Sequence, residues 1–189
     1  IACEKYIDGI NKVAENSLAN SLDNISIFHG NVNQFLDEYC SYKSISEIYI
    51  LFPDPRPKKR HFKRRLINDS FFKKIKHYLN NGALIHIIVP HPRHDDFLSD
   101  PTHVRAVTTT GLTLFDREIN ELWIEKGAAN SPLAIIHKVN FKIIKNEISL
   151  DMKYSELYKN KKISSEELND QIMKFNNVVK QTYYVLKVI

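Results

Sequence analysis

Two largely apolar runs constrain the fold of this chain more than any other feature. They are EIYILF (Glu47–Phe52) and ALIHIIV (Ala83–Val89), and a proline, Pro53 or Pro90, stops each of them. A strand with one face in water alternates apolar and polar residues, whereas a parallel strand that is covered on both faces is apolar throughout. The two runs therefore predict parallel strands inside an α/β sheet.

The segments around these runs alternate between the strand and helix patterns. Apolar residues recur at helical spacing over Tyr6–Leu18 and Leu66–Leu79, and Asn81-Gly82 is expected to end the second helix. Short strands are expected at Ile1–Glu4 and Asn24–Gly30, the latter followed by a short helix in NVNQFLDEY. The order strand, helix, strand, helix, strand, helix, strand is typical of a doubly wound sheet.

The second half of the chain is less regular. A long loop is expected over Pro90–Thr110, then a helix in LTLFDREINELWIEKG and one or two strands in LAIIHKVNFKIIKNEISL. Ser164-Ser165, with Glu167, predicts a capped helix before a last strand, QTYYVLKVI. We therefore expect one domain over residues 1–189, a doubly wound, mostly parallel, Rossmann-like sheet with an antiparallel C-terminal strand or hairpin.

Positive charge is concentrated in one place. The chain has a net charge of +5, and Arg56–Arg65 contains seven Lys or Arg residues and no acid. Without that run the chain would be slightly acidic, so the basicity is local. Such a cluster predicts a polyanionic partner, and nucleic acid is the first candidate. The alternative is a solvated helix start, although seven neighbouring positive charges repel one another without a counter-anion.

Composition excludes several classes of protein. Cys3 and Cys40 are too few for a disulfide framework and lack zinc-finger spacing, which favours a reducing, cytoplasmic setting. No apolar run approaches the roughly 20 residues of a membrane helix, and no signal peptide is evident. Ile1 in place of Met is consistent with a chain that begins inside a longer protein.

Polar residues follow each predicted strand, where an open parallel sheet binds its ligands. Glu4 follows the first strand, Asn31 the second, Asp54 the third and His91 the fourth. A carboxylate in this position can accept hydrogen bonds from ribose hydroxyls, which makes Glu4 a candidate ligand of a nucleotide cofactor. The alternative is a surface acid that favours the start of a helix.

The segment LFPDPRPKKRHFKRRLI resembles the signature of the tRNA (guanine-N7)-methyltransferases, class I S-adenosylmethionine-dependent enzymes. That pattern is a strand, then Pro-Asp-Pro-Trp-Pro-Lys, then an Arg-His-x-Lys-Arg-Arg run. IACEKYIDGI and HGNVNQFL resemble the same family's cofactor segments, and the resemblance covers roughly Ile1–Val89. It implies S-adenosyl-L-methionine as the cofactor and tRNA as the partner.

The resemblance also implies roles for matching positions. Glu4 and Asn31 would bind the ribose and adenine side of the cofactor, and Asp54 would lie beside both the methyl donor and the target base. The residues that would contact the substrate RNA are Lys58, Arg60, His61, Lys63, Arg64 and Arg65. Guanine N7 carries no proton, so catalysis needs positioning and a carboxylate to stabilise the growing positive charge rather than a strong base.

The sequence departs from the family pattern at several points. The glycine-rich loop that precedes the Glu4 strand is absent, so the domain is expected to lack its first strand and that loop. Arg56 replaces the usual Trp, VPHPRHDDF replaces a Thr-Asp pair, and the late Thr-Lys-Phe/Tyr-Glu motif is missing. DPTHVRAVT instead resembles a segment of other class I methyltransferases, which leaves the substrate open.

The loop after Pro90 is rich in His and Asp, a composition that could also bind a metal. No two of its histidines have the i, i+4 spacing of a zinc protease, so we expect no metal. We expect a substrate loop instead, with Asp95, Asp96, His103 and Arg105 as its polar contacts.

The sequence thus predicts methyl transfer from S-adenosylmethionine to guanine N7 in tRNA. The alternatives are a class I methyltransferase with another substrate and a non-catalytic RNA-binding remnant. Nothing in the sequence predicts the oligomeric state.

Overall fold

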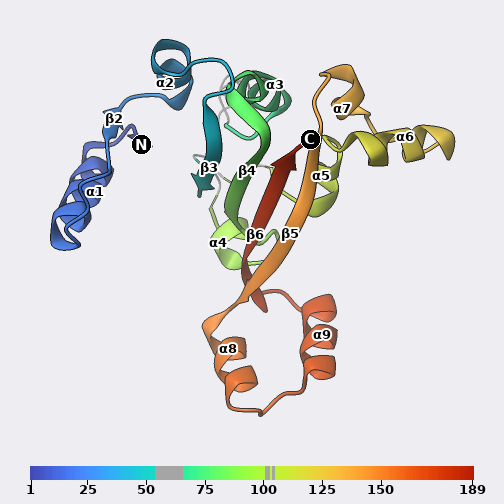
Figure 1. Cartoon of the computed structure of the whole chain (residues 1–189). Coiled ribbons are helices and arrows are strands. Elements are labelled where there is room, and N and C mark those ends of the chain that lie inside the picture. The colour runs from blue at the N-terminus through green and yellow to red at the C-terminus, as the bar shows by residue number, and fades with distance from the viewer. Residues whose placement is uncertain (54–65, 101–102, 104) are drawn as a thin grey trace.

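The computed structural model describes residues 1–53, 66–100, 103 and 105–189. Strands and helices alternate along the first half of the chain, as Figure 1 shows. Their order is β1 (Ala2–Glu4), α1 (Ile7–Ala19), β2 (Ile27–His29), α2 (Val32–Tyr39), β3 (Ile45–Leu51), α3 (Asp69–Tyr78) and β4 (Leu79–Pro90). This is the order that the sequence predicted.

The second half adds short helices and a two-stranded hairpin. The elements are α4 (Asp95–Leu98), α5 (Thr109–Thr113), α6 (Arg117–Glu125), α7 (Leu133–Ile136), β5 (Phe141–Leu150), α8 (Met152–Lys159), α9 (Ser165–Lys174) and β6 (Val179–Val188). Ser164 and Glu167 form the predicted capping box at the start of α9. None of the helices in the described ranges is both long and apolar enough to cross a membrane.

Four strands form the main sheet, in the order β3-β4-β6-β5. β3 and β4 are parallel, whereas β6 runs antiparallel to both β4 and β5. The α/β class, the parallel pairing and the antiparallel C-terminal hairpin are therefore confirmed. Within the hairpin, β6 pairs with β4 and β5 lies beyond β6, so β5 forms one edge of the sheet and β3 the other.

The hydrophobic core lies between this sheet and α3. Phe72 and Ile75 of α3 are fully buried, as are Ile85 and Ile87 of β4. The Phe72 ring lies 5.3 Å from the ring of Phe141 on β5, which ties the helix to the far edge of the sheet. Helical spacing in α3 and continuous apolar sequence in β4 thus meet in one core.

The opposite face of the sheet is more polar and partly exposed. Glu47 and Tyr49 of β3 point to this face together with His86 of β4 and Tyr183 of β6. The Tyr49 and His86 rings stack at 4.2 Å, and His86 Nε2 lies 2.6 Å from Glu47 Oε1. Tyr49 remains 60% exposed and His86 is 7% exposed, so in the described part of the chain this face is covered at β4 but open at β3.

β1 and β2 form a second, separate parallel sheet rather than continuing the first. Figure 1 shows this pair and α1 standing apart from the main sheet. No residue of α1 is buried, and β3 is an unpaired edge within the described part of the chain. The expected single sheet is divided because nothing in the described ranges bridges β1 and β3.

The end of α3 differs from the prediction. The helix stops at Tyr78, and Leu79 is already the first residue of β4. Gly82 has φ +80° inside that strand, where the pairing with β3 becomes irregular. The prediction that Asn81-Gly82 ends a helix is therefore wrong, because the left-handed freedom of glycine serves a bulge in the strand instead.

The second half of the chain also contains shorter and more numerous helices than predicted. The predicted single helix divides into α5 and α6, because Asp116 accepts a hydrogen bond from Ile119 N and starts a new helix. The predicted long loop contains α4, and α7 occupies the start of the segment expected to hold one or two strands. Short capped turns therefore replace the longer elements that periodicity indicated.

Candidate functional site

Glu4 and Asn31 lie together at the carboxyl ends of β1 and β2. The strands pair with Glu4 opposite His29, and Gly30 N donates to the Glu4 carbonyl at 3.0 Å. Asn31 is the N-cap of α2, where its side chain accepts a hydrogen bond from Asn33 N at 2.9 Å. The parallel pairing therefore brings the two predicted cofactor residues to one edge.

The Glu4 carboxylate is anchored at the start of α1. Its Oε1 accepts hydrogen bonds from Lys5 N at 2.7 Å and Tyr6 N at 2.9 Å. A Cβ on Gly9 would meet the Glu4 carboxyl group at 2.8 Å, so the side chain lies directly against the first turn of the helix. The helix-start role considered from the sequence is present, and it fixes one oxygen while Oε2 accepts no hydrogen bond within the described residues.

The end of β3 has an unusual backbone conformation. Phe52 has φ +46°, in the left-handed region that non-glycine residues seldom adopt, and its N–H donates to Ile88 O at 3.0 Å. Such strained positions are concentrated at functional sites. The conformation directs the chain out of the sheet at Pro53. The residues that follow, Asp54, Lys58, Arg60, His61, Lys63, Arg64 and Arg65, lie outside the described residues.

A cavity of about 360 Å³ opens beside Pro53, at the carboxyl ends of β3 and β4. Its walls are mainly apolar, with Phe52, Phe72 and Leu112 among them, and its polar groups include those of His103 and Arg105. An apolar cavity with a few convergent polar groups is the usual form of a small-ligand site. Two of the four predicted loop contacts, His103 and Arg105, therefore line it.

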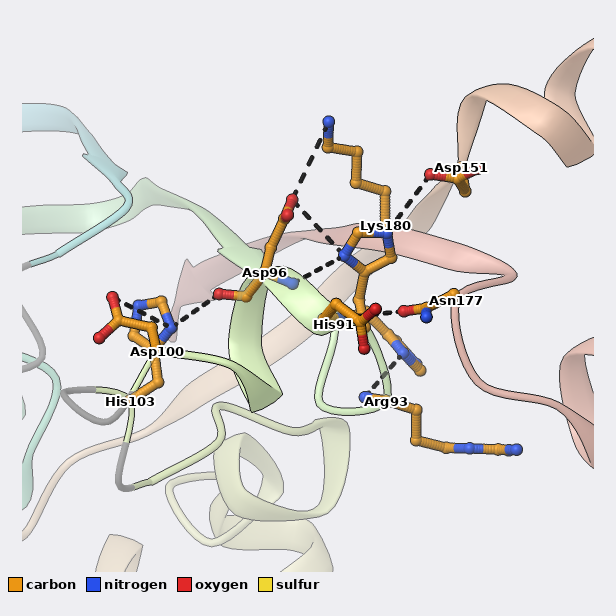
Figure 2. A network of polar contacts seen from close by, with 10 residues as sticks. His91, Arg93, Asp96, Asp100, His103, Asp151, Asn177 and Lys180 are labelled. Atoms are coloured by element: carbon orange, nitrogen blue, oxygen red, sulfur yellow. Dashed lines mark hydrogen bonds and ion pairs between the residues drawn. The ribbon is translucent and has the colours of Figure 1, made fainter.

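His103 is held in place by its neighbours. Its Nδ1 lies 3.0 Å from the carbonyl of Asp96, and its ring stacks on Phe97 with centroids 5.4 Å apart and planes 3° from parallel. Asp100 Oδ2 lies 3.9 Å from the same nitrogen. Figure 2 shows the contacts of His103 with Asp96 and Asp100 from close by. The imidazole therefore presents a fixed, flat edge to the cavity.

Asp95 and Asp96, the other two predicted contacts, are not among the cavity-lining residues. Asp95 N donates to Asn177 Oδ1 at 2.7 Å, and the Asp96 carboxylate lies 3.9 Å from Lys180 Nζ (Figure 2). Both residues thus face β6 and the chain before it. The structure brings His103 and Arg105 together at the cavity and uses Asp95 and Asp96 in the scaffold.

Sequence reasoning missed the residues that support this loop. His94, which is 6% exposed, lies 3.4 Å from Asp151 Oδ2, and Asn177 N donates to the carbonyl of Arg93. Burial, with Arg93 nearby, lowers the pKa of His91. The partners of His94 and Arg93 named above are more than 50 positions away, so no local pattern could have indicated them.

No metal centre is visible in the described ranges. Across residues 1–53, 66–100, 103 and 105–189, no three His, Cys, Asp or Glu side chains are grouped as metal ligands would be. The described residues offer hydrogen bonding by Glu4 and Asn31 on one sheet, and a mainly apolar cavity with His103 and Arg105 on the other.

The sequence matches known methyltransferases over most of its first two thirds. A family model described as "Putative methyltransferase" matches residues 1–129. The tRNA (guanine-N(7)-)-methyltransferase of Leptospira interrogans is 42% identical over 76 residues, 40% of this chain and 35% of that protein. The enzyme of the same name from Syntrophotalea carbinolica is 35% identical over 83 residues, 44% of this chain and 36% of that protein. The chain thus spans somewhat over a third of the length of these relatives.

Solved structures share the fold at low sequence identity. A SAM-dependent methyltransferase from Archaeoglobus fulgidus aligns with a TM-score of 0.58 and 12% identity, over 98% of this chain and 74% of that one. The YcgJ protein from Bacillus subtilis aligns with a TM-score of 0.51 and 10% identity, over 98% and 80% of the two chains. The arrangement of strands and helices is therefore that of these α/β proteins.

Proposed function

The chain belongs to this methyltransferase family, and on that premise we propose that it is part of an enzyme that methylates N7 of a guanine in tRNA with S-adenosylmethionine. The observation that carries the proposal is the 42% identity to a tRNA (guanine-N(7)-)-methyltransferase. The run from Leu51 to Arg65, which resembles that family's signature, supports it. The proposal places the protein with its tRNA substrate in the cytoplasm.

Glu4 and Asn31 are suited to the nucleoside part of the cofactor. The cofactor supplies an electrophilic methyl group on a sulfonium ion. The free Oε2 of Glu4 can accept hydrogen bonds from ribose hydroxyls, while its Oε1 remains fixed by Lys5 N and Tyr6 N. Asn31, two residues after β2, would contact the adenine side.

The cavity beside Pro53 is suited to the target base. Its apolar walls would hold the flat purine, and Arg105 would donate hydrogen bonds to acceptors on the base or its phosphate. His103, whose Nδ1–H donates to the Asp96 carbonyl, would accept a hydrogen bond from the base at Nε2. Asp54, the next residue after Pro53, would hold the edge of the base. Its carboxylate would stabilise the positive charge that develops as N7 gains a methyl group.

The basic run would bind the backbone of the RNA. Lys58 would reach the target nucleotide, and Arg60, His61, Lys63, Arg64 and Arg65 would contact neighbouring phosphates. Phosphate contacts of this kind fix orientation and carry no sequence information. Asp54 would therefore contact the target base, and the cations after it would contact the RNA backbone. This division accounts for one carboxylate placed directly before a cationic run.

We also propose that the complete domain has a further strand between β1 and β3, within one methyltransferase domain. β3 is an unpaired edge in the described part of the chain, and α1 has no buried residue. Tyr49, Leu51 and Phe52 are more than half exposed at that edge. A strand with its helix would pair with both edges and cover these side chains, as parallel sheets require.

The complete protein, with Asp54→Ala and Asp95→Ala as paired variants, tests the proposed chemistry. We expect Asp54→Ala to lower methyl transfer to unmodified tRNA by about a hundredfold, because the charge-stabilising carboxylate is lost. Its affinity for tRNA should hold, because no cation is removed. Asp95→Ala removes an acid from the same region but not from the cavity, so turnover should stay within about twofold of the unaltered enzyme.

Three results would contradict the proposal in different ways. Undiminished turnover by Asp54→Ala would remove that residue from the chemistry. Methylation of another substrate but not of tRNA would favour a class I methyltransferase of different specificity, as the DPTHVRAVT segment allows. Binding of tRNA without any methyl transfer would favour an RNA-binding remnant.

A further inference from the structure

Helices α8 and α9 form an arm that interrupts the C-terminal hairpin. The arm comprises residues 151–176, between the end of β5 and the start of β6. Figure 1 shows it projecting from the end of the main sheet at which α4 also lies, which is the carboxyl end of β4. The arm therefore extends from the same end of the sheet as the cavity.

Arg93 fixes the end of α9 to the loop after β4. Its Nη1 donates to the carbonyls of Ile172 at 3.0 Å and Met173 at 3.1 Å, and its Nε donates to Asn176 Oδ1 at 3.2 Å. These carbonyls belong to the last turn of the helix, where a cation also opposes the negative end of the helix dipole. Asn177 Oδ1 accepts from Asp95 N at 2.7 Å and completes this attachment.

A second attachment holds the start of α8. Asp151 Oδ1 caps the helix by accepting from Lys153 N at 3.1 Å, and Asp151 Oδ2 lies 3.4 Å from the buried His94 Nε2 (Figure 2). His94 belongs to the same loop as Arg93. Because both ends of the arm are bound to one loop, its direction relative to the cavity is set.

The tip of the arm carries exposed positive charge. Lys159, Lys161 and Lys162 are all exposed, and within the described residues none of them lies in an ion pair. Lys161 has φ +54°, which makes the tight turn at the tip. The Tyr158 hydroxyl lies 3.0 Å from Ser165 Oγ, so the two helices are braced just behind the turn.

The tip contains no acid of its own: between Glu156 and Glu166 the chain has three lysines and no Asp or Glu. Glu167 is engaged in the capping box, where hydrogen bonds from Ser164 lower its pKa. Asp170 pairs with Lys174 at 2.7 Å. Asp151 caps α8, and Glu156 and Glu166 flank the tip on α8 and in the first turn of α9. Three neighbouring lysines thus form a local positive patch on a fixed arm.

We propose that the lysine tip, Lys159, Lys161 and Lys162, binds backbone phosphates of the substrate RNA away from the methylated nucleotide. This inference rests on the proposed function. A fixed arm at the cavity end of the sheet favours a polymer long enough to reach both places. Lysine binds phosphate as a point charge without reading bases, so the tip would orient the RNA rather than select its sequence.

The test is a comparison of salt dependence in tRNA binding, measured by fluorescence anisotropy with the intact chain and an unmodified tRNA. Each phosphate contact contributes roughly 0.7 to 0.9 to the slope of log K against log salt. Lys159→Ala/Lys161→Ala/Lys162→Ala should therefore flatten the slope by about two. The corresponding triple arginine variant should retain it.

A matched control removes the same charge elsewhere. Lys142, Lys145 and Lys174 already pair with Glu118, Glu147 and Asp170. Replacing these three lysines with alanine should leave the slope within about half a unit of the original, because they hold no phosphate. A loss as large as that of the tip variant would show general attraction and overturn the assignment of the tip.

The outcomes separate this inference from the proposed function. If the unaltered chain binds tRNA and the tip variant keeps its affinity and slope, the inference alone is wrong. If the unaltered chain binds no tRNA, the RNA-binding part of the proposed function fails and the inference fails with it. If the tip variant loses binding to polyglutamate but not to tRNA, the tip is a site for an acidic protein instead.

Discussion

The segment from β1 to α2 and the four-stranded sheet use similar sequence patterns and reach different degrees of burial. α1 has regular helical spacing but no buried residue, and α2 buries only Leu36. In α3, four side chains are buried, Phe72 and Ile75 completely. An amphipathic helix is therefore stabilised by the surface it packs on, because most helical stability comes from tertiary packing.

Within the described residues, the two regions meet through Leu36, which packs into the core of the main sheet, and through a polar joint beside it. Asp37 of α2 accepts hydrogen bonds from Lys74 Nζ at 2.6 Å and from Tyr78 OH at 2.9 Å, both on α3. Lys74 Nζ also donates to Asn33 O at 3.0 Å. The cofactor edge at Glu4 thus depends on a region with little core of its own, while the cavity is built on the well-packed sheet.

The largest expected effect tests this difference in burial. Phe72→Ala should lower the free energy of unfolding by about 3–5 kcal/mol, because it leaves a cavity among fully buried side chains. Leu18→Ala, on the exposed face of α1 (Leu18 is 82% exposed), should change it by less than about 0.5 kcal/mol. Urea denaturation followed by circular dichroism measures both. Losses of equal size would contradict the comparison.

A helix-cap pair gives a smaller and more closely matched effect. Asn68 and Asn31 cap α3 and α2 by accepting from backbone N–H groups at 2.8 and 2.9 Å. Asn68→Ala should cost about 1 kcal/mol in global unfolding, the usual value of such a cap. Asn31→Ala should cost less than half as much, because α2 contributes little to the core. Thermal unfolding of the two variants measures both losses of stability. Equal losses would contradict the expectation and would show that α2 unfolds in the same cooperative unit as α3.

The smallest expected effect concerns acid. Hydrogen bonds from Lys74 and then Tyr78 lower the pKa of Asp37. Because the folded pKa is the lower one, the joint contributes fully above the ordinary aspartate pKa of about 3.9 and loses that contribution as the pH falls through the folded value. The amide protection factors of α2, which are corrected for the intrinsic exchange rate at each pH, should therefore fall at acidic pH before those of β4 do.

Asp37→Asn provides the control for the acid experiment. Residue 37 cannot titrate in this variant, so the protection factors of α2 should already be lower at pH 7. They should not fall further through the pH range in which Asp37 is protonated. If its exchange followed the same acid profile as the unaltered chain, another group would control the joint.

The sequence predicted the elements whose signals are local. EIYILF and ALIHIIV became the parallel pair β3 and β4, Ser164 with Glu167 became a capping box, and QTYYVLKVI became β6. It also indicated the family, through the segment after β3. It was wrong about Asn81-Gly82, because glycine is compatible with both a helix end and a strand bulge, and only the pairing with β3 distinguishes them.

Tertiary structure alone decided which polar residues share a site. Composition placed Asp95, Asp96, His103 and Arg105 in one loop, but the fold turns the first two toward Asn177 and Lys180 and the last two toward the cavity. Periodicity and capping act over one or two helical turns, so sequence reveals them directly. Contacts between residues more than 70 positions apart depend on how strands are ordered in the sheet, and that order is fixed by packing of the whole core.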